Sequence, residues 1–346
     1  MTQTLSPVEA NSRRVAHWLL FCAGMVFAMA IIGAITRLTE SGLSITEWKP
    51  ITGTIPPLSE AQWMVEFEKY KQIPEYQVLN RGMSLDDFKS IFFWEWFHRL
   101  WGRLIGLVFA VPLVWFAVRG QISRSMLPKL VGLFLLGGLQ GFIGWFMVQS
   151  GLVDRTDVSH YRLALHLSMA LILYALLIRV ALGLLHPQAK AHPDRVGLVA
   201  HGRLALVMVA ITVVWGAFVA GLDAGFAYNT WPLMNGDFAP PEIWNLSPAW
   251  LNFLENTAAV QFTHRWLAIA TAFAVVSYAW RVGQRANLVP AARGVALGVT
   301  AAVLAQVGLG ILTLLMAVPV ALGSAHQGGA MVVIGLMVWS LHTLRR

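Results

Sequence analysis

The chain has 346 residues, of which 57% are hydrophobic and only 12% are charged. Soluble domains carry about 25% charged residues, so this composition excludes a water-soluble globular protein and predicts that most of the surface faces lipid. A net charge of +8 in so apolar a chain indicates membrane topology and not nucleic-acid binding. The single cysteine, Cys22, excludes an intrachain disulfide and a cysteine-based metal site.

Eight apolar runs are long enough to cross a membrane, which takes about 20 mostly apolar residues. They begin near Val15, Phe97, Leu127, Ser159, Val199, Phe262, Ala291 and Pro319. The first run continues past the Ala28-Met29-Ala30 triplet, which favours a membrane helix over a cleaved signal peptide. The expected fold class is therefore an all-α polytopic membrane protein with eight transmembrane helices.

The distribution of charge predicts the orientation of these helices. The N-terminus, the exits of the even-numbered helices and the C-terminus carry 14 of the 25 basic residues, against two acids, Glu9 and Asp194. By the positive-inside rule, both termini face the cytoplasm and the long loops face out. The N-terminus has no Arg- and Ser-rich amphipathic run of the kind found in transit peptides. We therefore expect a multi-pass protein of a bacterial cytoplasmic (inner) membrane.

The sequence contains an internal duplication. At a constant offset of 183, the matches are Gly33-Ala34 with Gly216-Ala217, Glu40 with Asp223, Gly42 with Gly225, and Trp48 with Trp231. At an offset of 166 they are His98-Arg99 with His264-Arg265, Gln140 with Gln306 and Gly144 with Gly310, and at an offset of 160 His166 with His326. Four helices per copy insert both copies in the same orientation. We expect two parallel-repeat four-helix bundles, an N-terminal half of residues 1–190 and a C-terminal half of residues 191–346.

The two copies differ in their first outer loop, which spans residues 36–95 in the first copy. The offset between matching residues falls by 17, from 183 at Trp48 to 166 at His98. The first copy therefore carries an extra segment between these two residues. The charges and tyrosines of residues 60–89 predict one or two small amphipathic helices on the outer surface.

Four histidines lie in the outer halves of the second, fourth, sixth and eighth helices: His98, His166, His264 and His326. Ionisable side chains inside a membrane are costly and usually functional. Two imidazoles on different helices of one bundle can bind the iron of a planar macrocycle from both faces. We interpret the four as two pairs of axial haem ligands, the alternative being a structural hydrogen-bonding role. Zinc would need three or four converging ligands, and neither HExxH nor paired cysteines occur.

Arginines accompany these histidines at the outer boundary. Arg99 and Arg103 follow His98, Arg265 follows His264, and Arg37 is a similar candidate. A guanidinium can hold a carboxylate bidentately, so these side chains are candidates for binding outward-pointing haem propionates. The alternative is that they extend to the lipid head groups.

One acidic residue distinguishes the two copies. Glu95 lies three residues before His98, one helical turn away on the same face, and Gln261 stands at the equivalent place before His264. Only the first copy therefore has a built-in proton donor or acceptor beside its histidine, which predicts a reacting haem there and an electron-transfer haem in the second copy. The alternative is an exposed Glu95–Arg99 ion pair.

Four segments resemble the haem A synthase family, and the resemblance extends over essentially the whole chain. They are Glu47-Trp48-Lys49-Pro50-Ile51-Thr52-Gly53, Glu95-Trp96-Phe97-His98-Arg99, Thr263-His264-Arg265 and Ala325-His326-Gln327-Gly328. The long first outer loop and the single cysteine are similar to the proteobacterial and mitochondrial branch. The cysteine pair of other branches is absent here, so a thiol-based mechanism does not carry over.

The resemblance implies a reaction and its ligands. Haem O is converted to haem A for terminal oxidases by oxidation of the C8 methyl to a formyl group in two successive hydroxylations. His98 and His166 flank the substrate haem, His264 and His326 ligate a haem b, and Glu95 is the functional acid. Expected partners are haem O, an electron donor of ferredoxin or quinol type, haem O synthase, oxidase assembly factors and the lipid bilayer, with a homo-oligomer as an alternative to a single copy.

Three other functions share parts of this pattern. A non-catalytic di-haem cytochrome would use the same histidines without needing Glu95. A haem carrier or assembly factor would release the haem that it received. A solute transporter would need charged residues near mid-membrane, whereas the deepest polar pair is Gln140 and Gln306, which we interpret as interhelical hydrogen-bonding residues.

Overall fold

The structure is a computed structural model that describes residues 6–153, 155–187, 195–284 and 290–344. Over these residues it is helical apart from turns, loops and one isolated bridge between Met234 and Asp237. Eight of the described helices are long and apolar enough to cross a membrane, which confirms the expected fold class. They are α1 (Pro7–Leu38), α4 (Leu85–Val118), α5 (Leu127–Gln149), α6 (His160–Leu185), α7 (Val196–Gly221), α9 (Thr257–Gln284), α10 (Pro290–Leu315) and α11 (Val320–Thr343).

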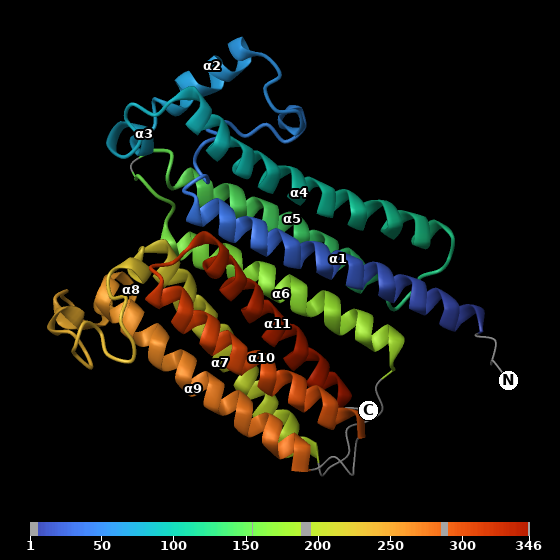
Figure 1. The fold of residues 1–346 in the computed structure, drawn as a ribbon. Helices are drawn as coiled ribbons and strands as arrows, with labels where there is room; N and C mark the ends of the chain where they lie inside the picture. Colours follow the sequence, from blue (N-terminus) through green and yellow to red (C-terminus); the bar gives the residue numbers. More distant parts are fainter. Residues whose placement is uncertain (1–5, 154, 188–194, 285–289, 345–346) are drawn as a thin grey trace.

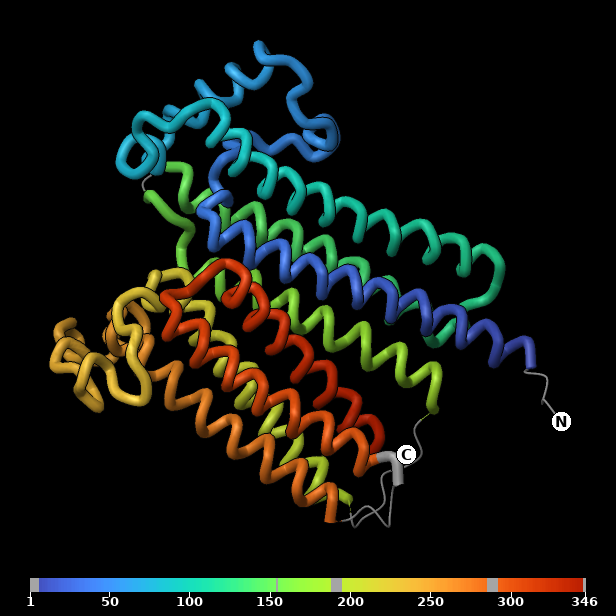
Figure 2. Tube along the Cα trace, viewed as in Figure 1, coloured from blue at the N-terminus to red at the C-terminus, as the bar shows by residue number. Residues whose placement is uncertain are grey.

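The long helices run roughly alongside one another in two groups (Figures 1 and 2). One contains α1, α4, α5 and α6, and the other contains α7, α9, α10 and α11. The groups meet where α1 packs against α11 and where α6 packs against α7 and α11. The expected boundary between residues 190 and 191 lies outside the described residues.

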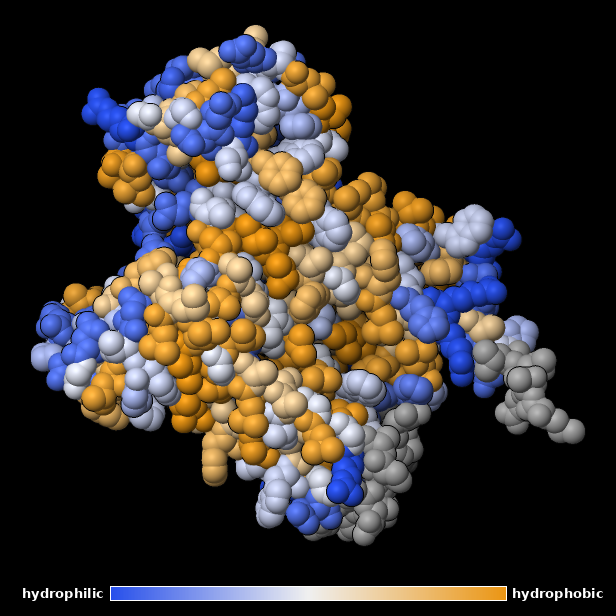
Figure 3. Space-filling view, in the orientation of Figure 1, coloured by the Kyte–Doolittle hydropathy of each residue, from blue (hydrophilic) through white to orange (hydrophobic). Residues whose placement is uncertain are grey.

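The surface of the helices is apolar, as lipid contact requires. In Figure 3 hydrophobic side chains cover the long helices, whereas hydrophilic ones gather over the loops at one end and over the helix ends opposite. Leu107, Val111, Phe142 and Phe273 are among the exposed apolar side chains. In water such surface would be unfavourable, so this is a multi-pass membrane protein.

Several helices begin before the apolar run that predicts them. α4 begins at Leu85, well before Phe97, because Ser84 and Asp87 form a capping box there. α1 begins at Pro7 behind a similar box made by Ser6 and Glu9. The hydrophobic run marks the part of a helix that lipid covers, whereas the cap marks where the backbone hydrogen bonds begin.

The extra segment of the first outer loop is helical, as expected. It forms α2 (Glu60–Tyr70) and α3 (Pro74–Val78), which stand above the first group of helices in Figure 1. Phe67 and Tyr70 pack against Phe88 and Phe92 of α4 in a buried aromatic cluster. The corresponding region of the second group contains the short helix α8 (Asn252–Glu255) and 3-10 turns at Ala224–Phe226, Pro241–Trp244 and Ala249–Leu251.

Candidate functional site

The four predicted histidines come from four of the long helices. His98 lies on α4 and His166 on α6, in the first group, whereas His264 lies on α9 and His326 on α11, in the second group. Each is half-buried. Each residue therefore keeps part of its surface accessible, unlike a core histidine packed on all sides. A further histidine, His160, is the buried first residue of α6.

Every one of these imidazoles packs against a glycine of a neighbouring helix. A Cβ atom added to the glycine would lie between 2.7 and 3.2 Å from the imidazole Cε1, closer than ordinary van der Waals contact. A larger residue would push the ring away, so glycine fixes where the imidazole lies. The pairs and distances are Gly33 with His98 at 3.2 Å, Gly144 with His166 at 2.7 Å, Gly216 with His264 at 3.1 Å and Gly310 with His326 at 2.8 Å.

Polar partners orient three of the rings. The side-chain Nε2 of Gln140 lies 3.1 Å from His166 Nδ1, and that of Gln306 lies 3.1 Å from His326 Nδ1. His264 Nδ1 lies 3.2 Å from the carbonyl oxygen of Thr212, to which it can donate. Gln140 and Gln306 thus bond between helices, as predicted, and their partners are the candidate ligands themselves.

One of these partners suits a histidine that binds a metal through Nε2. Such a histidine carries its proton on Nδ1 and donates it to an acceptor in the surrounding shell. The carbonyl of Thr212 is such an acceptor. The Nε2 atoms of Gln140 and Gln306 also donate to backbone carbonyls, that of His166 at 3.0 Å and that of His326 at 2.8 Å, whereas their Oε1 atoms are buried without a hydrogen-bond partner among the described residues.

The guanidinium of Arg99 bonds to the first outer loop. Its Nη2 donates to the carbonyl of Ile45 at 2.8 Å and to Glu95 Oε1 at 2.6 Å, and its Nη1 donates to the carbonyl of Glu47 at 3.0 Å. The guanidinium also lies 5.6 Å from the centroid of the Trp48 ring. Arg99 therefore fastens this loop to the outer half of α4.

Arg265 makes the same contacts in the second group. Its Nη2 donates to the carbonyl of Tyr228 at 2.8 Å and to Gln261 Oε1 at 2.8 Å, and its Nη1 donates to the carbonyl of Thr230 at 2.9 Å. The guanidinium lies 5.9 Å from the centroid of Trp231. Each loop partner stands 183 residues after its counterpart, so the matched segments of sequence also make matched contacts.

The other two arginines occupy different places. Arg103 donates through Nε to the carbonyl of Pro50 at 2.8 Å and through Nη2 to the carbonyl of Lys49 at 2.9 Å, and its Nη1 is buried without a partner in the described structure. Arg37 donates to Asp223 at 2.8 Å and to the carbonyl of Ala220 at 2.8 Å. Arg37 thus joins the two helix groups, and its hydrogen bonds in the described structure go to the second group.

Glu95 is buried, with a relative exposure of 3%, so its ion pair with Arg99 is not the exposed one considered as an alternative. Its Oε2 accepts from the Ser44 hydroxyl at 2.8 Å and from the Ile45 backbone N–H at 2.6 Å, in addition to the bond from Arg99 to Oε1. The carboxylate accepts three hydrogen bonds and is rigidly held one turn from His98.

Gln261 takes the equivalent place in the second group and is also buried. Its Oε1 accepts from Arg265, and its Nε2 donates to the carbonyl of Ala224 at 2.5 Å. The amide keeps the bond to arginine that the carboxylate makes, but it brings no negative charge. The two clusters therefore share a shape and differ by one charge.

The sequence did not indicate Ser44, the Ile45 amide or Thr212 as parts of these clusters. Ser44 lies two residues after the repeated Gly42, which is the one signal that could have drawn attention to it. Backbone donors and acceptors leave no mark in a sequence. Gly328 and Gly329, which follow His326, face Ile31 and Gln306 respectively.

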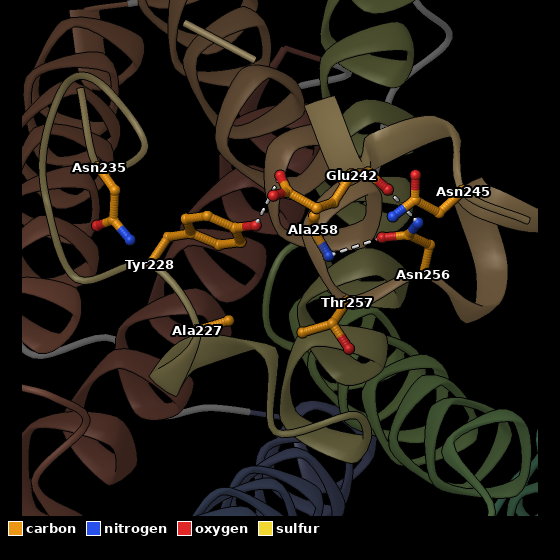
Figure 4. Close-up of a pocket in the computed structure, with 8 residues that line it drawn as sticks. All are labelled: Ala227, Tyr228, Asn235, Glu242, Asn245, Asn256, Thr257 and Ala258. Atoms are coloured by element: carbon orange, nitrogen blue, oxygen red, sulfur yellow. Dashed lines mark hydrogen bonds between the residues drawn. The ribbon is translucent and has the colours of Figure 1, made fainter. Parts of the chain in front are cut away.

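A polar pocket lies away from the histidines, among the outer loops of the second group (Figure 4). Tyr228 and Glu242 face each other across it at 3.5 Å, and Asn256 donates to the carbonyl of Glu242 at 2.6 Å. None of the predicted site residues lines it. Among the described residues no group of three or more His, Cys, Asp or Glu is placed to hold a metal ion.

Comparison with known proteins assigns the family. A sequence profile of the cytochrome oxidase assembly protein family matches residues 16–338. A heme A synthase of Rhodospirillum centenum is 68% identical over 97% of this chain and 90% of its own length. The chain belongs to the haem A synthase family. Other members are heme A synthases of Maricaulis maris, 51% identical over 98% of both chains, and of Parvibaculum lavamentivorans, 48% identical over 99% of this chain and 97% of that protein.

Membership of this family confirms the resemblance drawn from the four sequence segments. The matched region covers 97% of this chain, so the resemblance is not confined to the four segments.

Proposed function

We propose that the chain is a haem A synthase that oxidises the C8 methyl of haem O to a formyl group in two hydroxylations. The first half, residues 1–190, would hold the substrate haem between His98 and His166. The second half, residues 191–346, would hold a haem b between His264 and His326. The protein would lie in the bacterial inner membrane with both termini in the cytoplasm.

The donor set supports haem at both places. Each half offers two imidazoles on different helices, each seated against a glycine. In the part of the chain that the structure describes, neither pair belongs to a group of three or more His, Cys, Asp or Glu placed to hold a metal ion. Paired neutral nitrogen ligands suit a haem iron and leave a zinc ion undercoordinated. When bound, haem b would supply one-electron transfer.

Unpartnered donors support the placement of the propionates. Arg103 Nη1 and Arg265 Nε are buried without partners in the described structure, and a buried unpaired donor is costly. A propionate carboxylate would satisfy each of them. Arg99 is less suited to this role, because its charge is already matched by Glu95 at 2.6 Å.

We assign the reaction to the first half because of one difference. Glu95 stands three residues before His98, and the equivalent residue before His264 is Gln261. Glu95 can accept or return a proton beside His98, whereas the amide of Gln261 cannot. Arg99, Ser44 and the Ile45 amide fix the direction in which the carboxylate points, and burial excludes bulk water from it. The second cluster retains the framework without this chemistry, as an electron-transfer site requires.

Extraction of the bound haems tests this proposal. Wild type and Glu95→Gln would be expressed beside a haem O source and purified, and their acid-extracted haems would be separated and identified by mass. We expect haem A or its hydroxylated precursor from wild type, and haem O in the variant. The substitution reproduces the residue that the second cluster tolerates, so the loop contacts of Arg99 should survive. Haem b alone in both samples would reject the synthase and favour a di-haem cytochrome, and haem O unchanged in wild type would favour a carrier.

A further inference from the structure

Glu75 is a buried acid that the function above does not use. It lies on α3, within the segment that makes the first outer loop longer than its counterpart. Its relative exposure is 3%, although most charged side chains of this segment face water. Acidic side chains are almost never fully buried unless they are paired, so this burial calls for a partner or a function.

The polar surroundings of Glu75 are incomplete. Tyr70 of α2 lies within hydrogen-bonding reach of the carboxyl, and its hydroxyl accepts from Asn80 Nδ2 at 2.7 Å. The Oε2 atom of Glu75 is buried with no hydrogen-bond partner in the described structure. No cation forms an ion pair with the carboxyl there, in contrast to Glu95 and Arg99.

The charged groups facing Glu75 come from two other elements. Glu95 of α4 and Glu40, just after α1, both oppose ionisation of Glu75, and Arg37 at the end of α1 favours it. Burial acts first and in the same direction as the two acids. Together they raise the pKa of Glu75 from 4.5 to about 8. At neutral pH the Glu75 carboxyl therefore keeps its proton.

Glu95 is bound in the opposite way. Three donors surround its oxygens, one of them a guanidinium at 2.6 Å, so its surroundings stabilise a carboxylate. Two neighbouring carboxyls in a medium of low polarity do not both ionise readily, and one of them then keeps the proton for the pair. The donors around Glu95 favour its carboxylate form, whereas Glu75 Oε2 accepts from no donor in the described structure.

We propose that Glu75 is the proton-exchange partner of Glu95, connecting the first haem site with the outer aqueous side. No hydrogen bond joins the two carboxyls directly in the described structure, so the exchange would pass through a water molecule between them. The O–H bond of Glu75 breaks as an O–H bond forms on this water, another O–H bond of the water breaks as one forms on a Glu95 oxygen, and the negative charge passes from Glu95 to Glu75. The outer medium then returns a proton to Glu75 through the loop segment. The role in turnover rests on the proposed function, because it requires that Glu95 handles protons during oxidation of the methyl group.

The pairing can be tested without turnover. Infrared difference spectra of the purified full-length protein between acidic and alkaline pH would reveal the C=O stretch of a protonated carboxyl. We expect a band that titrates near pH 8 in wild type, is absent from Glu75→Gln and is retained by Glu75→Asp. In Glu95→Gln the band should titrate at lower pH, because one of the opposing charges is gone. Glu68→Gln is the control, since its side chain is 55% exposed and lies outside this cluster.

Two results of that experiment would overturn the pairing. One is a band that persists in Glu75→Gln, and the other is a titration that Glu95→Gln leaves where it is in wild type. Neither result depends on haem A formation. If the protein made no haem A, the proposed function would be refuted, and the infrared experiment would still decide whether Glu75 and Glu95 are paired.

Turnover then tests the role of the pair. Glu75→Gln should lower the rate of haem O conversion by about tenfold or more, since proton transfer by a positioned side chain contributes at least that much. The variant should also lose the change in rate near pH 8, and Glu75→Asp should restore part of both. A wild-type rate and pH profile in Glu75→Gln would show that Glu75 is only structural.

Discussion

The clusters around Arg99 and Arg265 share one framework and differ in one side chain. In both, an arginine one residue after a candidate ligand fastens an outer loop through two carbonyls and lies beside a tryptophan. In the first cluster the arginine also meets a carboxylate, and in the second it meets an amide. Both partners accept the same hydrogen bond, so the difference is one of charge and not of shape.

This difference changes the electrostatic balance of the two sites. The Glu95–Arg99 pair has no net charge. Arg265 is buried beside the neutral Gln261, and no acidic side chain of the described residues forms an ion pair with it. An unpaired buried cation is costly and favours an anionic partner. The second site therefore has more to gain from a bound propionate, and the first has a group that can exchange protons.

The histidines provide the strongest test of this comparison. We expect His98→Ala to abolish haem A formation and to leave the haem of the second half in place. His264→Ala should instead remove that second haem, and product formation should fall with it because the electron path is lost. Optical spectra and haem content per polypeptide would separate the two. Loss of both haems from each variant would mean that the halves do not bind haem independently.

Exchanging the two distinguishing side chains would sharpen the comparison. Glu95→Gln should lower the rate of conversion by about 10²- to 10⁴-fold, which is the usual contribution of a general acid or base. Gln261→Glu should keep the protein folded and at least partly active, because the Arg265 contact survives. The double variant should stay as inactive as Glu95→Gln, as followed by haem extraction. Recovery of activity in the double variant would show that the carboxylate acts from either half.

The glycines beside the imidazoles offer a smaller and symmetric perturbation. Gly144→Ala and Gly310→Ala should each displace the adjacent ring and weaken haem binding in that half alone. The cost in stability should be about 1–3 kcal/mol, as for overpacked cores. Gly138→Ala and Gly308→Ala are matched controls on the same two helices, because nothing lies within 4 Å of a Cβ added there. Thermal unfolding and haem content would report the effect, and equal behaviour of site and control variants would contradict the role of these glycines.

The pH dependence of stability should distinguish the first half through Glu75. Its pKa is about 8 in the folded protein and 4.5 in an exposed carboxyl, so between these values the folded state binds more protons than the unfolded state. The free energy of unfolding should then fall as the pH rises through this window, by at most about 1.4 kcal/mol per pH unit. Glu75→Gln should lack this slope in thermal unfolding measured across the window. Parallel curves for the two proteins would place the titration elsewhere.

Much of the fold could be predicted from the sequence because lipid imposes a simple rule. Every membrane helix needs a long apolar run, so eight runs predicted eight helices. The true starts of α1 and α4 were missed, since caps such as Ser84 with Asp87 lie outside the apolar run. The amphipathic helices of residues 60–89 could also be predicted, from their charges and aromatic residues.

The site was predictable only as far as its repeated side chains. The duplication indicated His98, His166, His264 and His326, and it isolated Glu95 as the exception. The partners of the arginines could not be predicted, because most of them are loop carbonyls that every residue type provides. Glu75 was missed for a different reason. Its burial depends on how α2 and α3 pack over α4, and the acidic composition of that segment favoured an exposed side chain.

The contact between Arg37 and Ala220 shows how the two copies within one chain can become different. Ala220 stands 183 residues after Arg37, in the place of Arg37 itself, and its carbonyl accepts from Arg37 at 2.8 Å. In a dimer of identical subunits, a residue on the twofold axis faces its own copy, and two arginines would repel each other there. A single chain is free of that constraint, so one copy keeps the cation while the other supplies a carbonyl and, nearby, Asp223. The same freedom allows a carboxylate in one cluster and an amide in the other, a division of labour that no homodimer could encode.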